Sequence, residues 1–176
     1  RLLELVVTEP SPNTAMLAMM LAGGMMASEI GRLDPEAVTR TLASKFPHVV
    51  VGSNGTKVKA EARRRIVPVV WSPEVLAVIR EYLPEAIARA AASTDPTATP
   101  NKYLKSRGFN ITGHSLRHTL AAVAGVAMAN PIALARVAGW SGSGLNPVML
   151  GYGAGDDGSE LLESLTAEVK RWWKCC

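Results

Sequence analysis

Two short runs of β-branched residues, HVVVGS at 48–53 and RRIVPVV at 64–70, constrain the fold most, because the segments around them have helical patterns. The connection between the two runs is basic and contains glycine, which is typical of a hairpin. Pro68 indicates that the second run ends there or lies at an edge. The segment AVTRTL at 37–42 is a candidate third strand. The sequence therefore predicts an α+β fold that is mainly α, with one small antiparallel sheet.

Helix start and stop signals divide the rest of the chain. Capping residues mark three expected starts: Asn13 or Thr14, Ser72 before Pro73, and Asn130 before Pro131. Gly23-Gly24 ends the first helix, and the turn-rich segment STDPTATPN at 93–101 is expected to be a connection. A further helix begins near Ser115. Its apolar face is predicted to contain Leu116, Leu120, Val123, Val126 and Ala127.

The end of the chain, DDGSELLESLTAEVKRWW at 156–173, is predicted to be an amphipathic helix. Acidic residues stand at its start and basic residues at its end, as the helix dipole favours. Its apolar stripe consists of Leu161, Leu162, Leu165, Val169 and Trp172. This stripe is too apolar to face water, so either the chain's own domain or a neighbouring subunit must cover it.

The overall charge is compatible with a polyanionic partner. The net charge is +4 and the pI is about 9.3, and five of the bases lie within nine positions, at Lys57, Lys59, Arg63, Arg64 and Arg65. The alternative for this basic run is a solvated loop. No apolar run is long enough to span a membrane, and the two terminal cysteines fit a reducing compartment.

The segment TGHSLRHTLA at 112–121 places polar groups at the start of an apolar helix. His114 and His118 are four residues apart, but the zincin pattern needs a glutamate where Ser115 stands, and a third ligand is not obvious. We therefore predict a capping or structural role rather than a metal site. The glycine-rich GYGAGDDG at 151–158 lacks the Lys-Ser/Thr pair of a nucleotide-binding loop. The sequence predicts no cofactor.

From this segment onward, the chain resembles the tyrosine recombinases, or phage integrases. GHSLRHTLA matches the family's His-x-x-Arg at a helix start, AGW its Gly-His/Trp element, and LGYGAG the region of its nucleophilic tyrosine. Upstream, GGMMASEIGRLDPEAV is similar to the family's Gly-Leu-Arg-x-Ser-Glu-Leu segment, and KVKAEARRRIVPV to its basic hairpin. The resemblance covers nearly the whole chain in the same order. It implies that residues 1–176 form one catalytic domain, without the N-terminal arm that closes around DNA.

The resemblance also implies an activity: site-specific DNA recombination or integration through a 3′-phosphotyrosine intermediate. Tyr152 would be the nucleophile, and Arg117, His114 and Trp140 would stabilise the charge on the phosphate. A hairpin lysine would be the general acid. Lys59 is preferred for that role, and Lys57 is the alternative. Arg63, Arg64 and Arg65 would bind the DNA backbone. The expected partner is double-stranded DNA, with no metal and no membrane.

One departure from the family lies at Met26, which occupies the position of the first catalytic arginine. A neutral side chain there removes one of two phosphate clamps, so impaired activity is expected. The alternative is a catalytically inactive integrase-like protein that binds DNA. In the family the last helix often packs on a neighbouring subunit, so an oligomer on DNA is expected. The location implied is cytoplasmic, or nucleoid-associated in a bacterial or phage context.

Overall fold

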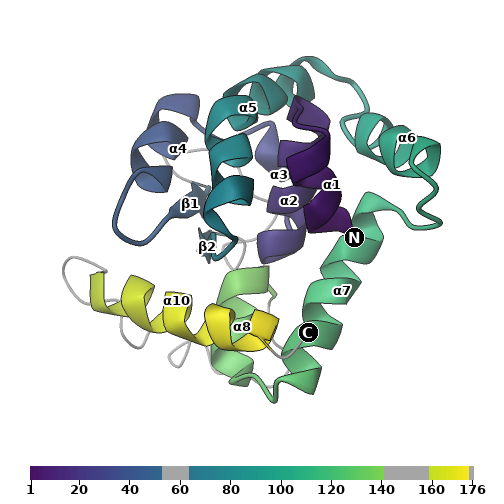
Figure 1. The fold of residues 1–176 in the computed structure, drawn as a ribbon. Helices are drawn as coiled ribbons and strands as arrows, with labels where there is room; N and C mark the ends of the chain where they lie inside the picture. Colours follow the sequence, from purple (N-terminus) through teal and green to yellow (C-terminus); the bar gives the residue numbers. More distant parts are fainter. Residues whose placement is uncertain (53–63, 141–158, 175–176) are drawn as a thin grey trace.

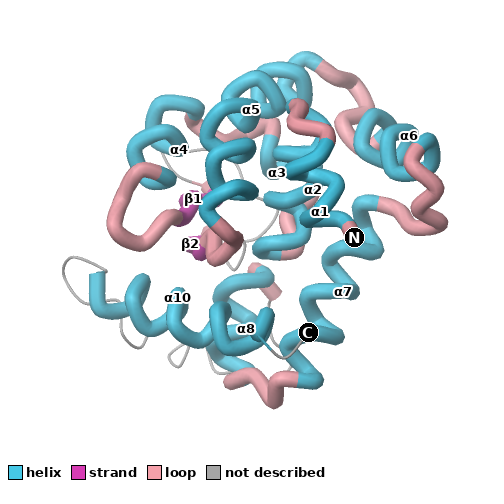
Figure 2. Tube along the Cα trace, in the orientation of Figure 1, coloured by secondary structure: helices cyan, strands magenta, loops and turns pink. Residues whose placement is uncertain are grey.

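The computed structural model describes residues 1–52, 64–140 and 159–174, and the following account concerns these residues. They form a mainly helical structure with one two-stranded antiparallel sheet (Figures 1 and 2). Strands β1 (His48–Val51) and β2 (Arg65–Pro68) pair in a register that sets Val49 opposite Val67. The predicted α+β class and the antiparallel pair are therefore confirmed.

Helix α2 (Pro12–Gly23) lies at the centre, and all of its residues except Asn13 are buried. A helix that is apolar on every side must be covered on every side. Among the described elements, those that pack against it include α1 (Leu2–Thr8), α3 (Ala27–Ile30), α5 (Pro73–Ala92), α6 (Ala98–Ser106), α7 (Gly113–Val126) and β2. Its N-cap is Ser11, in a reciprocal capping box with Thr14, rather than the expected Asn13 or Thr14.

Two segments that were not expected to be helical form helices. The candidate third strand is instead α4 (Pro35–Leu42), because Asp34 caps the helix and accepts the N–H groups of Glu36 and Ala37. The end of the expected connection at 93–101 is the first turn of α6. The predicted starts of α5 at Ser72 and of α8 (Pro131–Ala138) at Asn130 are confirmed.

Helix α10 (Ser159–Lys174) forms a second apolar cluster with α7 and α8. Figure 1 shows it beside α8, below the two strands. Leu165, Val169 and Trp172 of the predicted stripe are buried against the chain's own residues, while Leu161 and Leu162 are half-buried. The chain's own residues therefore cover the part of the stripe that contains Leu165, Val169 and Trp172.

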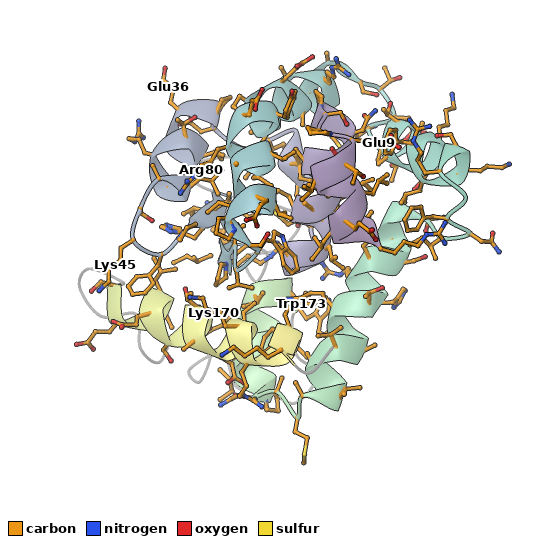
Figure 3. The ribbon with its side chains drawn as sticks, in the orientation of Figure 1. Glu9, Glu36, Lys45, Arg80, Lys170 and Trp173 are labelled. Carbon is orange, nitrogen blue, oxygen red and sulfur yellow. The ribbon has the colours of Figure 1, made fainter. Side chains whose placement is uncertain are left out.

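Two tryptophans join the clusters. Trp173, labelled in Figure 3, meets Trp71 edge to face with ring centroids 4.8 Å apart. The indole N–H of Trp71 donates to the carbonyl of Ala18, so this contact connects α10 to the central helix.

On α7, Val126 is 71% exposed and lies outside the apolar face that was predicted to contain it. None of the described helices has both the length and the apolar character needed to cross a bilayer.

Candidate functional site

Arg117 is the centre of the candidate site. It lies in the second turn of α7, whose start is fixed by a capping box between Thr112 and Ser115. Its side chain is only 9% exposed, and its Nη1 donates to the carbonyl of Gly24 at 2.6 Å. The guanidinium also lies 5.4 Å from the ring centroid of Trp140, within cation–π range. A backbone carbonyl and an indole ring thus hold the guanidinium in one place.

Gly24 makes the close approach of Arg117 possible. It is the C-cap of α2, with a left-handed φ of 58°, which a residue with a Cβ rarely adopts. A Cβ at this position would also lie 3.0 Å from Cγ of Arg117. The predicted break at Gly23-Gly24 therefore ends the central helix and supplies a carbonyl to the site.

Met26 follows this break as the N-cap of the short helix α3 (Ala27–Ile30). Its side chain is half-buried, and its backbone N–H donates to Oε2 of Glu29 at 2.8 Å. The structure thus places the segment that contains Met26 directly after the residue that contacts Arg117. A thioether cannot donate a hydrogen bond to a phosphate.

A buried ion pair, which no local sequence pattern predicts, supports the same region. Nη1 and Nη2 of Arg65 lie 3.1 Å from Oε1 and Oε2 of Glu29, and both side chains are almost completely buried. The Nε of Arg65 donates to the carbonyl of Val137 at 3.0 Å. Glu29, Arg65 and Val137 belong to α3, β2 and α8, so this fork–fork pair ties three elements together.

The burial of Arg65 corrects its predicted role. It was expected to face DNA within the run Arg63, Arg64 and Arg65, but its guanidinium is 2% exposed and is committed to Glu29 and Val137. Arg64 next to it is exposed and donates to the carbonyl of Gly52 at the end of the hairpin. Alternation along a strand sends neighbouring side chains to opposite faces, which explains the difference between the two arginines.

Trp140 depends on Arg65 for its position. The residue before it, Gly139, caps α8 with a left-handed φ of 64°. A Cβ on Gly139 would lie 2.8 Å from Cδ and Nη1 of Arg65. Because Arg65 packs directly beneath the end of α8, it fixes where the chain leaves the helix and therefore where the Trp140 ring meets Arg117.

His114 lies in the first turn of α7 and is exposed. Its ring meets that of His118 edge to face, with centroids 4.9 Å apart. The structure therefore pairs His114 with His118. Tyr152, Lys57, Lys59 and Arg63 lie outside the described residues. Of the predicted site residues, the structure brings together Arg117 and Trp140, next to the break that precedes Met26.

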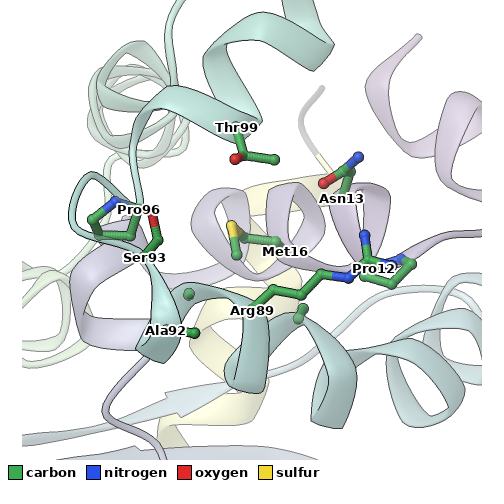
Figure 4. Close-up of a pocket in the computed structure, with 10 residues that line it drawn as sticks. Pro12, Asn13, Met16, Arg89, Ala92, Ser93, Pro96 and Thr99 are labelled. Atoms are coloured by element: carbon green, nitrogen blue, oxygen red, sulfur yellow. The ribbon is translucent and has the colours of Figure 1, made fainter.

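A cavity of about 400 Å³ lies elsewhere, between the start of α2, the end of α5 and α6 (Figure 4). Met16, Arg89 and Thr99 are among its lining residues. The guanidinium of Arg89 is already paired with the carboxylate of Glu85, one turn earlier on α5. None of the predicted site residues that the structure describes lines this cavity, so it is separate from the candidate site.

The described site offers fixed cationic and aromatic groups, Arg117 and Trp140. Within residues 1–52, 64–140 and 159–174, no group of three or more His, Cys, Asp or Glu side chains is placed to hold a metal ion. No protein-family model matches the chain, and neither a curated protein nor a solved structure matches it. Chemically, an arginine held in one orientation can grip two oxygens of a phosphate.

Proposed function

We propose that this chain is the catalytic domain of a tyrosine recombinase, which breaks and rejoins DNA at a specific site. The observation that supports the proposal most is the meeting of Arg117, Trp140 and the Gly24 break from three separate segments. Each of these segments resembles the family in sequence. Arg117 contacts both Gly24 and Trp140. A site in which all three segments bind one phosphate requires such contacts.

In the proposed reaction, the hydroxyl oxygen of Tyr152 attacks the phosphorus of a DNA phosphodiester, and its proton passes to His114 or to water. The bond from phosphorus to the 5′-oxygen breaks, and that oxygen takes a proton from Lys59, or from Lys57. The products are a 3′-phosphotyrosine and a free 5′-hydroxyl, and the reverse reaction with another 5′-hydroxyl rejoins a strand. Arg117 would bind the non-bridging oxygens, whose charge increases in the transition state. His114 and the indole N–H of Trp140 would donate to the same phosphate.

The proposal is tested by trapping the covalent intermediate on a nicked suicide substrate, whose short 5′ fragment diffuses away after cleavage. The wild-type chain should form a detergent-resistant protein–DNA adduct, and Tyr152→Phe should form none while still binding DNA. Tyr103→Phe is the matched control. The Tyr103 hydroxyl donates to Glu9 at 3.0 Å, and burial together with Glu9 raises the pKa of this phenol, so it is a poor nucleophile. An adduct that survives Tyr152→Phe would refute the proposal.

The second candidate is a catalytically inactive relative that binds DNA. Met26 favours it, because the side chain at the first-arginine position cannot clamp a phosphate. This candidate predicts retarded mobility of DNA in gels without any adduct, both in the wild-type chain and after Met26→Arg.

A further inference from the structure

His114 and His118 form an exposed pair of imidazoles on one face of α7. Residues four apart on a helix are neighbours, and the rings lie 4.9 Å apart at an interplanar angle of 85°. Among the described residues, neither ring takes part in a hydrogen bond or an ion pair. His48, by contrast, has its Nδ1 2.8 Å from the carbonyl of Phe46.

The spacing of the two rings suits a single metal ion. With a metal–nitrogen bond of about 2.1 Å and about 1.1 Å from nitrogen to ring centre, each centroid lies roughly 3.2 Å from the metal. Two such rings are about 4.5 Å apart when the ligand angle is 90°, and about 5.2 Å apart when it is tetrahedral. The separation of 4.9 Å in the structure falls between these values. The rings now meet edge to face, so these exposed side chains would have to rotate for one nitrogen of each to point at a shared ion.

The chemistry of the pair selects the class of ion. Neutral imidazole is a good ligand for Zn²⁺, Cu²⁺ and Ni²⁺, and a poor one for Mg²⁺ or Ca²⁺. A catalytic zinc site has three protein ligands, and the described residues supply no third one here. A two-imidazole chelate needs only this pair, with water in the remaining positions.

We propose that His114 and His118 chelate a divalent transition-metal ion such as Zn²⁺, and that the bound ion inhibits DNA cleavage by occupying His114. The inhibitory part rests on the proposed function, because it requires His114 to donate to the scissile phosphate. A ring nitrogen that binds a metal cannot donate a hydrogen bond at the same time, so inhibition requires the ion to take the nitrogen of His114 that would face the phosphate.

Chelation is tested first, by titrating ZnCl₂ into the full chain in a calorimeter without DNA. All proteins carry Cys175→Ser and Cys176→Ser, since thiolates also bind zinc. One ion should bind per chain, and His118→Ala should weaken binding about tenfold or more, because the second ligand on the same helix is lost. His48→Ala is the matched control and should bind as tightly as its parent. Equal affinity in all three proteins would refute the chelate.

Inhibition is tested by suicide-substrate trapping with and without zinc, in the same thiol-free background. Zinc should suppress adduct formation by the parent and by His48→Ala, whereas His118→Ala should cleave equally well with and without it. Zinc that binds the pair but leaves cleavage unchanged, or accelerates it, would overturn the inhibitory role. If no protein forms an adduct even without zinc, the proposed function fails and the inhibitory role fails with it, while calorimetry still decides the chelate.

Discussion

Arg64 and Arg65 are neighbours in the sequence, but their different burial predicts different effects on stability when each is replaced by alanine. Arg65→Ala would leave the carboxylate of Glu29 buried without its main partner, and breaking such a pair costs about 3–5 kcal/mol. Arg64→Ala should change the free energy of unfolding by less than about 0.5 kcal/mol, because its side chain is exposed. Urea unfolding followed by circular dichroism measures both. If Arg64 contacts a phosphate, its alanine variant should also lower the slope of log affinity against log salt by about 1. Equal stability of the two variants would contradict the structural role of Arg65.

Replacing Met26 by arginine tests whether this single residue limits DNA cleavage. Met26→Arg places a guanidinium two residues beyond Gly24, whose carbonyl already binds Arg117. One preorganised donor to a transition state contributes about 10²–10³ in rate. We therefore expect adduct formation on the suicide substrate to rise by about two to three orders of magnitude. Met26→Lys is the control for charge alone and should give a smaller increase, because an ammonium cannot form a bidentate contact. A wild-type chain that already cleaves as fast as the arginine variant would show that Met26 is not a deficiency.

At the scale of elements, a polar latch joins α10 to the turn between α7 and α8. Glu168 accepts the backbone N–H of Asn130 at 3.0 Å and the indole N–H of Trp172 at 2.9 Å. It also pairs with Arg171, which in turn donates to the carbonyls of Ala127 and Met128. Hydrogen bonds from Arg171, and then from Asn130 and Trp172, lower the pKa of Glu168 from 4.5 to about 2. The latch therefore depends on an ionised carboxylate.

The latch predicts a defined dependence of stability on pH. Because the pKa is about 2 in the folded chain and 4.5 in the unfolded chain, the contribution of Glu168 is complete above about pH 4.5. It is lost as the pH falls from 4.5 towards 2. Glu168→Gln should be less stable than the wild type at pH 7, and the difference should shrink across this window. Glu163→Gln, which changes an exposed carboxylate on the same helix, is the control. Chemical denaturation at several pH values measures the difference, and a constant gap between wild type and Glu168→Gln would contradict the latch.

At the scale of the whole molecule, local signals were readable from the sequence and long-range partners were not. Caps such as Ser72 and Asn130 act within four residues, so the local sequence alone predicts the starts of α5 and α8. The β-branched residues of AVTRTL at 37–42 favour a strand, but the stronger Asp34-Pro35 signal just before them starts a helix. The burial of Arg65 depends on Glu29, 36 residues away; strand alternation predicts that Arg64 and Arg65 face opposite sides but does not show which of the two is buried. The contact of Arg117 with Gly24 spans 93 residues, and no local pattern predicts it; the resemblance to a family implied only that the two segments serve one phosphate site.

Helix α10 packs against α7 and α8 through an apolar cluster that contains Trp172. Trp172 is fully buried in the second apolar cluster, and its indole N–H is bound to Glu168. Trp172→Ala should therefore lower the free energy of unfolding by about 3–5 kcal/mol, because it leaves a large cavity between α10, α7 and α8. Lys170→Ala, an exposed change on the same helix (Figure 3), should leave stability within about 0.5 kcal/mol. Denaturation followed by circular dichroism measures both, and light scattering on DNA reports assembly. A Trp172→Ala chain with unchanged stability but weaker oligomers would show that the stripe serves a neighbouring subunit instead.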